Sequence, residues 1–229
     1  EAGDALLAAA DNVAVGASAL SAETGGQNNV AIGKNALEAQ VNSSGNIYNT
    51  AVGSQAGKTI STGNQNTLIG GLAGDALTTG ESNVALGYAA LSSDDVGNHS
   101  VAIGHGALFT QNYATSTDSN NTAVGYNCGN AVTTGVQNTF VGAFAGDGTD
   151  DGNYNTALGY GALGANCGSN NVAVGNLAGA ACTTGGLTAV GDQAAEANTV
   201  AVGMTVIGNG AAHANTEGQL CLIAGSSAA

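Results

Sequence analysis

Few residues in this 229-residue chain have the types and spacing that catalysis requires. The segment 53–59, GSQAGKT, is glycine-rich and carries a lysine, as a phosphate-binding loop does. It is one residue short of that motif, and the equivalent segment 70–75 has Asp75 in the place of Lys58. We therefore expect no nucleotide site.

The histidines and serines give no sign of an active site. His99, His105 and His213 do not fall at the spacing of a ligand cluster, and no Ser-His-Asp or Cys-His arrangement follows from the sequence. We expect surface histidines, no enzymatic activity and no bound cofactor.

One acidic segment has the ligand types that Ca²⁺ prefers. Asp147, Asp150, Asp151 and Asn153 lie close together in the sequence, and carboxylate, amide and backbone oxygens coordinate hard cations. The segment lacks the spacing of an EF-hand and the nonapeptide of a calcium-binding β-roll. A solvated turn and a weak calcium site therefore both stay open, and the turn is the simpler interpretation.

The four cysteines, Cys128, Cys167, Cys182 and Cys221, are too widely spaced for a zinc or dithiol motif. Buried free thiols are the expectation. Cys167 and Cys182 are separated by about one repeat of the chain, so a disulfide between them is possible but is not predicted.

Composition and charge exclude several classes of protein. The chain has 38 glycines, no proline or tryptophan and only 8% charged residues, which disfavours long helices and an aromatic core. Its net charge is −14, and Lys34 and Lys58 are its only lysine or arginine residues, so it should repel nucleic acid and anionic membranes. No apolar stretch approaches the roughly twenty residues that span a bilayer, so we expect no membrane insertion.

An internal repeat dominates the chain. A pentad, Asn-Val/Thr-Ala-aliphatic-Gly, recurs twelve times at a nearly constant interval, and ends at Gly16, Gly33, Gly53, Gly70, Gly87, Gly104, Gly125, Gly142, Gly159, Gly175, Gly191 and Gly203. The most common interval, that from Gly16 to Gly33, suffices for two short strands and two turns. We therefore predict an all-β protein, a parallel β-solenoid of about twelve coils, in which the nine pentad asparagines form a ladder.

The alternation within the pentad predicts which residues share a face. The Val/Thr column and the aliphatic column lie two positions apart, and we expect both to face the interior. The column between them is alanine in ten copies and Leu68 and Phe140 in the other two. We expect this column to face outward against another copy of the chain, with Leu68 and Phe140 as candidate interface residues.

The domain boundaries follow from the repeat. Residues 1–11 are expected to form an N-terminal cap or connection, 12–203 the solenoid, and 204–229 a C-terminal cap or exit to a further domain. A block of four coils is duplicated, since the interval from Gly53 to Gly125 equals that from Gly70 to Gly142.

Two coils are longer than the rest, with extra residues around 40–48 and 109–120. Extra length in a solenoid usually forms a protruding loop, and such loops often bind ligands. Tyr48 and Tyr113 are therefore candidate receptor contacts, by stacking on a sugar or by contact with a protein. Alternatively, they only cover the base of the loop.

Copies such as 29–33 (NVAIG) and 100–104 (SVAIG) resemble the head-domain repeats of trimeric autotransporter adhesins, and 121–126 (NTAVGY) resembles repeats of bacteriophage tail fibres. The resemblance spans about residues 12–203. It implies a left-handed β-roll and a homotrimer.

The resemblance favours a structural and adhesive role over the other functions considered. We expect a phage tail-fibre shaft in the virion that presents host-attachment surfaces. The alternative is the head of a cell-surface trimeric adhesin or an extracellular filament subunit. An ice-binding solenoid is disfavoured, because the threonines are expected to share the inward-facing column.

Overall fold

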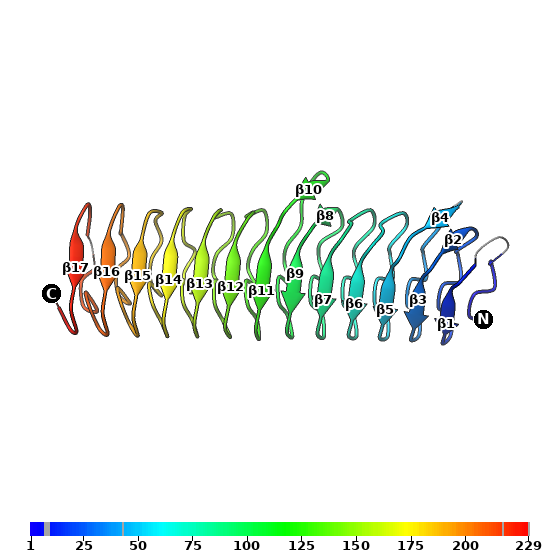
Figure 1. The fold of residues 1–229 in the computed structure, drawn as a ribbon, viewed down its shortest axis with the longest axis horizontal. Coiled ribbons are helices and arrows are strands. Elements are labelled where there is room, and N and C mark those ends of the chain that lie inside the picture. Colours follow the sequence, from blue (N-terminus) through cyan, green and yellow to red (C-terminus); the bar gives the residue numbers. More distant parts are fainter. Residues whose placement is uncertain (7–9, 43, 217, 229) are drawn as a thin grey trace. The chain divides into compact units, whose positions relative to one another are not determined.

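A short strand recurs once in every coil (Figure 1). The computed structural model describes residues 1–6, 10–42, 44–216 and 218–228, and the chain divides into two units, 1–120 and 121–229. In the first unit the repeated strands are β1 (Val13–Val15), β3 (Val30–Ile32), β5 (Thr50–Val52), β6 (Thr67–Ile69), β7 (Val84–Leu86) and β9 (Val101–Ile103). In the second they are β11 (Thr122–Val124), β12 (Thr139–Val141), β13 (Thr156–Leu158), β14 (Val172–Val174), β15 (Thr188–Val190), β16 (Thr205–Ile207) and β17 (Leu222–Ala224).

Within each unit these strands pair in parallel with their neighbours, and the pentads align in register. Val13 lies opposite Val30 in the first unit, and Thr139 lies opposite Thr156 in the second. No helix occurs among the described residues. The prediction of an all-β parallel solenoid of about twelve coils is thus confirmed, with six repeated strands described in the first unit and seven in the second.

A glycine after each repeated strand turns the chain out of the sheet. These corner glycines have φ values from +122° at Gly16 to +146° at Gly125, a region that L side chains rarely adopt. They also stack on one another. A Cβ atom on Gly142 would lie 2.5 Å from the carbonyl oxygen of Gly159 in the next coil. The spacing between adjacent strands therefore requires glycine at the corner, because any side chain there would collide with the next coil.

The face assignment predicted from the pentad is wrong. The middle column points inward: Ala31, Ala85 and Ala173 are fully buried. The flanking columns point outward, and none of their residues in β1 to β16 is buried. The alternation was correct, but the narrow coil holds the small residues inside and leaves the larger aliphatic ones on the surface.

Leu68 and Phe140 therefore lie in the interior, and their prediction as interface residues is wrong. Both are fully buried within the single chain. Each fills space that glycines leave on the opposite wall of the coil: a Cβ on Gly57 or Gly74 would lie within 2.8 Å of Leu68. A Cβ on Gly146 would lie 2.6 Å from the ring of Phe140.

The pairing of a large with a small residue across the coil accounts for part of the alternation of leucine and glycine at the fourth position after the corner glycine. Gly57, Gly129 and Gly179 do not follow it, because the strands of their own coils carry alanine. Where the strand carries alanine, this opposite position is often a buried leucine, as at Leu37, Leu91 and Leu108. Where the strand carries Leu68 or Phe140, the position is glycine. The interior volume is conserved by pairing large with small residues across the coil.

The predicted asparagine ladder is present in each unit. In the first, the side-chain carbonyl of Asn49 accepts a hydrogen bond from the backbone N–H of Asn66 at 2.9 Å, and Asn66 accepts one from Asn83 in the same way. The Asn66 amide also donates to the Gly80 carbonyl at 2.8 Å. In the second, Asn138 accepts the equivalent bond from the backbone N–H of Asn155. The ladder joins successive coils and fixes their register.

The solenoid continues beyond its predicted end at residue 203. The segment 200–203 matches the pentad, but it forms no strand of the repeated sheet; β16 and β17 do, each one full repeat after the strand before it. The predicted cap at 1–11 lies partly outside the described residues. Within it, Gly3 donates a backbone hydrogen bond to Ala19 at 2.9 Å.

Candidate functional site

The outer sheet face of each unit exposes two columns of aliphatic and threonine side chains. By outer sheet face we mean the residues that flank the buried middle column of the repeated strands. Its most exposed members in the second unit include Leu158 and Ile207, with 47% and 46% of their surface accessible. The first unit exposes Val15, Ile32 and Leu86 among others. A row of aliphatic side chains on adjacent strands is an unusual surface for an isolated protein.

One column of the same face carries threonine on several adjacent strands, and valine takes its place at positions 84, 101 and 172, among others. Thr139 and Thr156 lie on adjacent strands at matching positions, as do Thr50 and Thr67. The expectation that this column faces inward is wrong. Ice binding was disfavoured for that reason, so the objection no longer holds.

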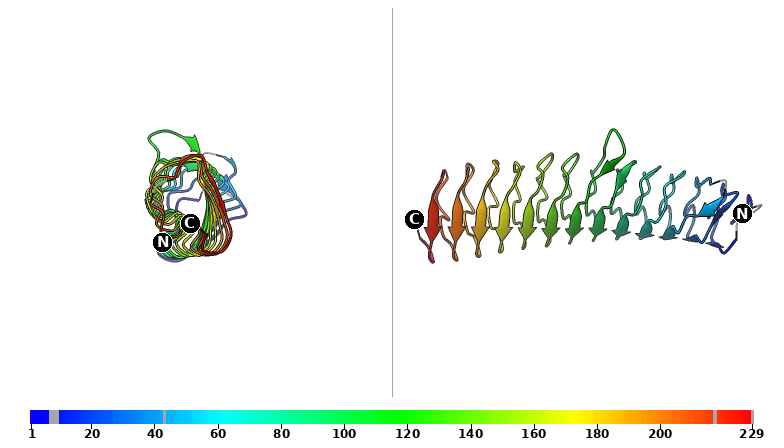
Figure 2. Two further views of the ribbon diagram at one scale, coloured as in Figure 1. Left: turned by 90° about the vertical axis from the view of Figure 1, so that its left-hand side faces the viewer. Right: turned by 45° about the horizontal axis from the view of Figure 1, so that its top comes forward.

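Each long coil forms a small accessory sheet with the coil before it. β2 (Gly26–Gln27) pairs with β4 (Gly45–Asn46), and β8 (Gly97–Asn98) pairs with β10 (Thr117–Asp118). The segment with β10 projects beyond its neighbouring coils in the first unit (Figure 2).

The two tyrosines of the long coils differ in exposure. Tyr48 is 52% exposed, but Tyr113 is only 6% exposed. Tyr113 is therefore buried within the single chain. Of these two candidates, Tyr48 alone has the accessibility that a receptor contact needs.

A buried carboxylate lies near the base of each long loop. In the first, the Oε1 atom of Glu23 accepts hydrogen bonds from the backbone N–H groups of Gly25, Gly26 and Asn42, and Oε2 accepts one from Gln40 at 2.8 Å. Gln40 in turn accepts a hydrogen bond from Asn49 at 2.8 Å across the base of the loop. This network closes the longer coil without breaking the asparagine ladder.

Asp94 takes the equivalent place under the second loop. It accepts hydrogen bonds from the Gly97 N–H at 2.9 Å and from Gln111 at 2.6 Å. Burial is the largest cause that raises the pKa of Asp94, and the charge of Asp95 adds to it. Burial would also raise the pKa of Glu23, but its hydrogen bonds from Gln40 and the backbone together hold it below the ordinary value.

The two carboxylates should therefore respond oppositely to pH. A lowered pKa at Glu23 stabilises the fold above the ordinary value and loses that effect as pH falls through the folded pKa. A raised pKa at Asp94 costs stability as pH rises from the ordinary value through the folded one. At pH 7 we expect Glu23→Gln to lower the free energy of unfolding by about 1–3 kcal/mol, and Asp94→Asn to leave it unchanged or raise it.

Urea unfolding of both variants at pH 4 and pH 7, followed by circular dichroism, measures the difference. Since both positions lie in the first unit, each variant is the control for the other. Equal losses at pH 7 would contradict the assignment.

Aromatic side chains form a row on the turns of the second unit. The ring centre of Phe144 lies 5.3 Å from that of Tyr126 and 5.7 Å from that of Tyr160, and the ring planes of both pairs meet at 79° in a T-shaped arrangement. Tyr126 and Tyr160 are 50% and 54% exposed. Each directly follows a corner glycine, so alignment of the repeats could have identified them as neighbours. In the first unit, Tyr88 holds the same position and stacks on His105 at 5.4 Å.

Farther along the second unit, the same position of the coil carries polar side chains. We call the residues that directly follow its corner glycines at 125, 142, 159, 175, 191 and 208 the turn column: Tyr126, Ala143, Tyr160, Asn176, Asp192 and Asn209. Asp192 accepts hydrogen bonds from Asn176 at 2.9 Å and from Asn209 at 3.1 Å. The column thus changes from aromatic to amide and carboxylate groups.

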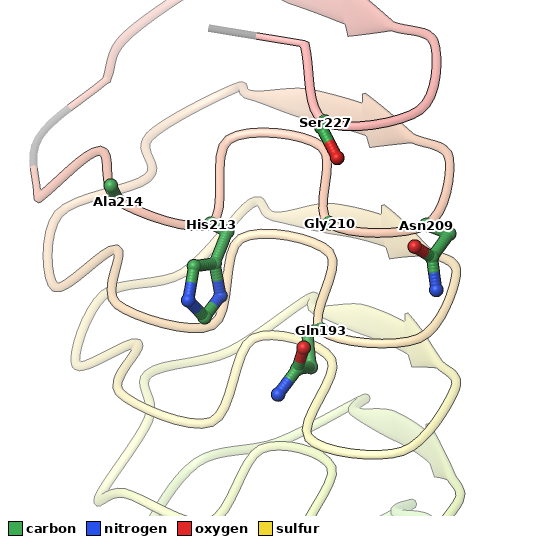
Figure 3. A pocket seen from close by; sticks show the side chains of 6 residues that line it. All are labelled: Gln193, Asn209, Gly210, His213, Ala214 and Ser227. Atoms are coloured by element: carbon green, nitrogen blue, oxygen red, sulfur yellow. The ribbon is translucent and has the colours of Figure 1, made fainter.

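A surface pocket of about 320 Å³ adjoins the polar end of the turn column (Figure 3). Its polar lining comes from Gln193, Asn209, His213 and Ser227, and Gly210 and Ala214 complete it. His213 lies 2.9 Å from a carboxylate oxygen of Glu196. The pocket was not predicted from the sequence, because its residues come from three coils and match no motif.

Two of the calcium candidates are engaged in hydrogen bonds with a neighbouring coil. Asp150 accepts a hydrogen bond from the Thr133 hydroxyl, and Asn153 accepts one from the Val136 N–H at 2.8 Å, both in the adjacent coil. Asp151 is exposed. In the part of the chain that the structure describes, no three His, Cys, Asp or Glu side chains are grouped to hold a metal ion.

All four cysteines are free thiols, and Cys167 and Cys182 form no disulfide. Cys128, Cys167 and Cys182 are buried, as expected, whereas Cys221 is partly exposed. Burial raises the pKa of the Cys128 thiol to about 12 and also raises the pKa values of Cys167 and Cys182. These three thiols therefore stay protonated and act as small apolar core groups.

Of the other predicted groups, His99 lies on the surface 3.3 Å from Asp118. No helix of the described residues is long and apolar enough to cross a membrane. Comparison of the chain with family models, with curated proteins and with solved structures found no match.

Proposed function

We propose that the chain is a structural segment of a multi-chain fibre, and that its copies associate through the outer sheet face. The observation that supports this is the ladder of half-exposed aliphatic side chains on that face. We still expect the chain to pack against another copy, but through the flanking columns and not through the middle column. The buried Leu68 and Phe140 play no part in it.

Apolar burial on this face would offset much of the cost of association. Complete burial of a Val, Leu or Ile side chain contributes about 1.5–3 kcal/mol, so a half-exposed one still offers about 1 kcal/mol. In the second unit, one column presents the exposed Leu158, Val190 and Ile207. Val124, Val141 and Val174 of the same column are only partly exposed and offer less. The sum over the column would offset much of the cost of ordering two chains in a complex.

The resemblance of the repeat suggests three copies in the assembly. Within this proposal, the chain is a phage tail-fibre type of shaft in the virion that presents surfaces for attachment to a host. The alternative is the head of a trimeric adhesin on a cell surface. Both are structural roles, and the proposal gives the chain no catalytic step, cofactor or nucleic-acid partner.

The test is the oligomeric state of charge variants of the outer sheet face. We expect the wild-type chain to form a trimer, measured by light scattering and sedimentation. Leu158→Glu places a charge in the middle of the column and should produce monomers with an unchanged circular dichroism spectrum. Thr134→Glu adds the same charge in an exposed turn and should leave the trimer intact.

A monomeric wild-type chain at micromolar concentration would contradict the proposal. So would a Leu158→Glu variant that keeps the wild-type mass.

The ladder of outward threonines supports one other candidate, an ice-binding face. Regular hydroxyl and methyl groups on parallel strands can order water. Thermal hysteresis of the wild-type chain, lost in Thr156→Glu, would identify this function in place of self-association.

A further inference from the structure

We propose that the turn column of the second unit binds a neutral, extended β-1,4-linked polysaccharide. The inference supplies the ligand class for the adhesive part of the proposed function, and in this sense it rests on that proposal. It uses a different surface, because the corner glycines turn the chain out of the sheet before the column begins.

The aromatic end of the column has the form of a stacking platform. Tyr126 and Tyr160 are half exposed, and Phe144 contacts both in T-shaped pairs at ring distances of 5.3 and 5.7 Å. The two tyrosines are thus held by a third ring and lose little side-chain entropy when a ligand covers them. The exposed half of each tyrosine ring offers apolar surface to the C–H side of a pyranose ring, and its hydroxyl group can bond to the sugar.

The spacing of the tyrosines selects the shape of the ligand. Tyr126 and Tyr160 belong to coils that are two apart, so they are separated by about 10 Å along the stack, since neighbouring strands lie about 4.8 Å apart. In an extended β-1,4-linked chain, alternate sugars present the same face at a similar repeat. The two tyrosines can therefore contact two sugars that lie two units apart in the same chain. A compact or branched glycan would reach only one of the two tyrosines.

The polar end of the column supplies hydrogen bonds along the same line. Asp192 holds Asn176 and Asn209 at 2.9 and 3.1 Å, and oriented amide and carboxylate groups pair well with sugar hydroxyls. The pocket lined by Asn209, His213 and Gln193 adjoins them and has room for a sugar substituent or chain end.

Charge decides between neutral and acidic polysaccharides. The second unit contains no lysine or arginine, whereas Asp192 and Glu196 lie along or beside the column. A uronic acid or sulfated sugar would be repelled there, with no lysine or arginine to bind it. The ligand is therefore a neutral glycan, with hydroxyl or N-acetyl substituents.

Binding of the full chain to insoluble cellulose and chitin, and to their soluble hexasaccharides by calorimetry, tests the proposal. We expect binding to at least one of the two, and at least about tenfold weaker binding by a Tyr126→Ala, Tyr160→Ala double variant. Tyr154→Ala is the matched control, because Tyr154 is 55% exposed in the same unit but lies outside the column. Alginate, an acidic polysaccharide, should not bind.

Two results would overturn the proposal: no binding of the wild-type chain to cellulose, chitin or their hexasaccharides, or equal binding by the wild-type chain and the double variant. Light scattering of every variant separates the two proposals. A trimer that binds no glycan refutes only the glycan site, and a monomer that binds one refutes only the assembly.

Discussion

Replacing Phe140 by alanine is expected to lower the free energy of unfolding of the second unit by about 3–5 kcal/mol. Phe140 is fully buried, and its ring occupies the space that Gly146 leaves on the opposite wall of the coil. The backbone is held by hydrogen bonds to the coils on both sides, so the coil cannot collapse into the cavity. Chemical unfolding followed by circular dichroism measures the loss.

A second substitution should recover part of this loss. Gly146→Leu alone is expected to be destabilising, because its Cβ would lie 2.6 Å from the Phe140 ring. In the Phe140→Ala background the same leucine fills the cavity. Its backbone fits, since Gly146 has φ +61° and the buried leucines at the equivalent positions 37, 91 and 108 have φ between +49° and +54°.

The measurement is a double-mutant cycle between the two positions. We expect the double variant to be more stable than either single variant. Additive losses would show that side chains at positions 140 and 146 do not compete for the same space. The pairing of a large with a small residue across the coil would then be refuted.

Gly70→Ala is expected to lower the free energy of unfolding of the first unit by at least about 3 kcal/mol. Gly70 is a corner glycine with φ +137°, and an added Cβ would lie 2.6 Å from the carbonyl carbon of Gly87 in the next coil. Backbone atoms cannot move aside without changing the strand spacing. Hydrogen exchange should show the loss first in the amides of β6 and β7.

The adjacent residue is the control for this prediction. Gly71 has no positive φ, and the nearest heavy atom to an added Cβ there is on the Tyr88 ring at 3.5 Å. Gly71→Ala should therefore be neutral or slightly stabilising, through the reduced entropy of the unfolded chain. Similar losses from both substitutions would mean that coil stacking does not depend on the corner position.

Much of the fold could be predicted from the sequence because the repeat determines it. The strand positions, the parallel register and the asparagine ladder follow from columns of similar residues. The direction of the faces does not, since a period of two shows only which residues share a face. One sign of the inward direction is that both large residues of the middle column, Leu68 and Phe140, occur with glycine at the opposite position of their coils. Glycine at that position also occurs with alanine in other coils, so the sequence pattern alone does not determine the direction.

The end of the solenoid was mispredicted because two segments, 200–203 and 205–208, both match the pentad. Only the second keeps the regular interval from the strand before it. The surface features were harder still. Tyr126 and Tyr160 share an alignment position, but their contact through Phe144 depends on turn geometry that the sequence pattern does not encode.

The different lengths of the coils show where the repeat tolerates change. The extra residues of the long coils fall between Gln40 and Asn49 and between Gln111 and Asn121, while the strand, the corner glycine and the turns that follow keep their register. Each coil thus contains a constant segment, which determines how successive coils stack, and a variable segment, which can change in length and sequence. New recognition loops can be acquired at that single point without redesigning the scaffold.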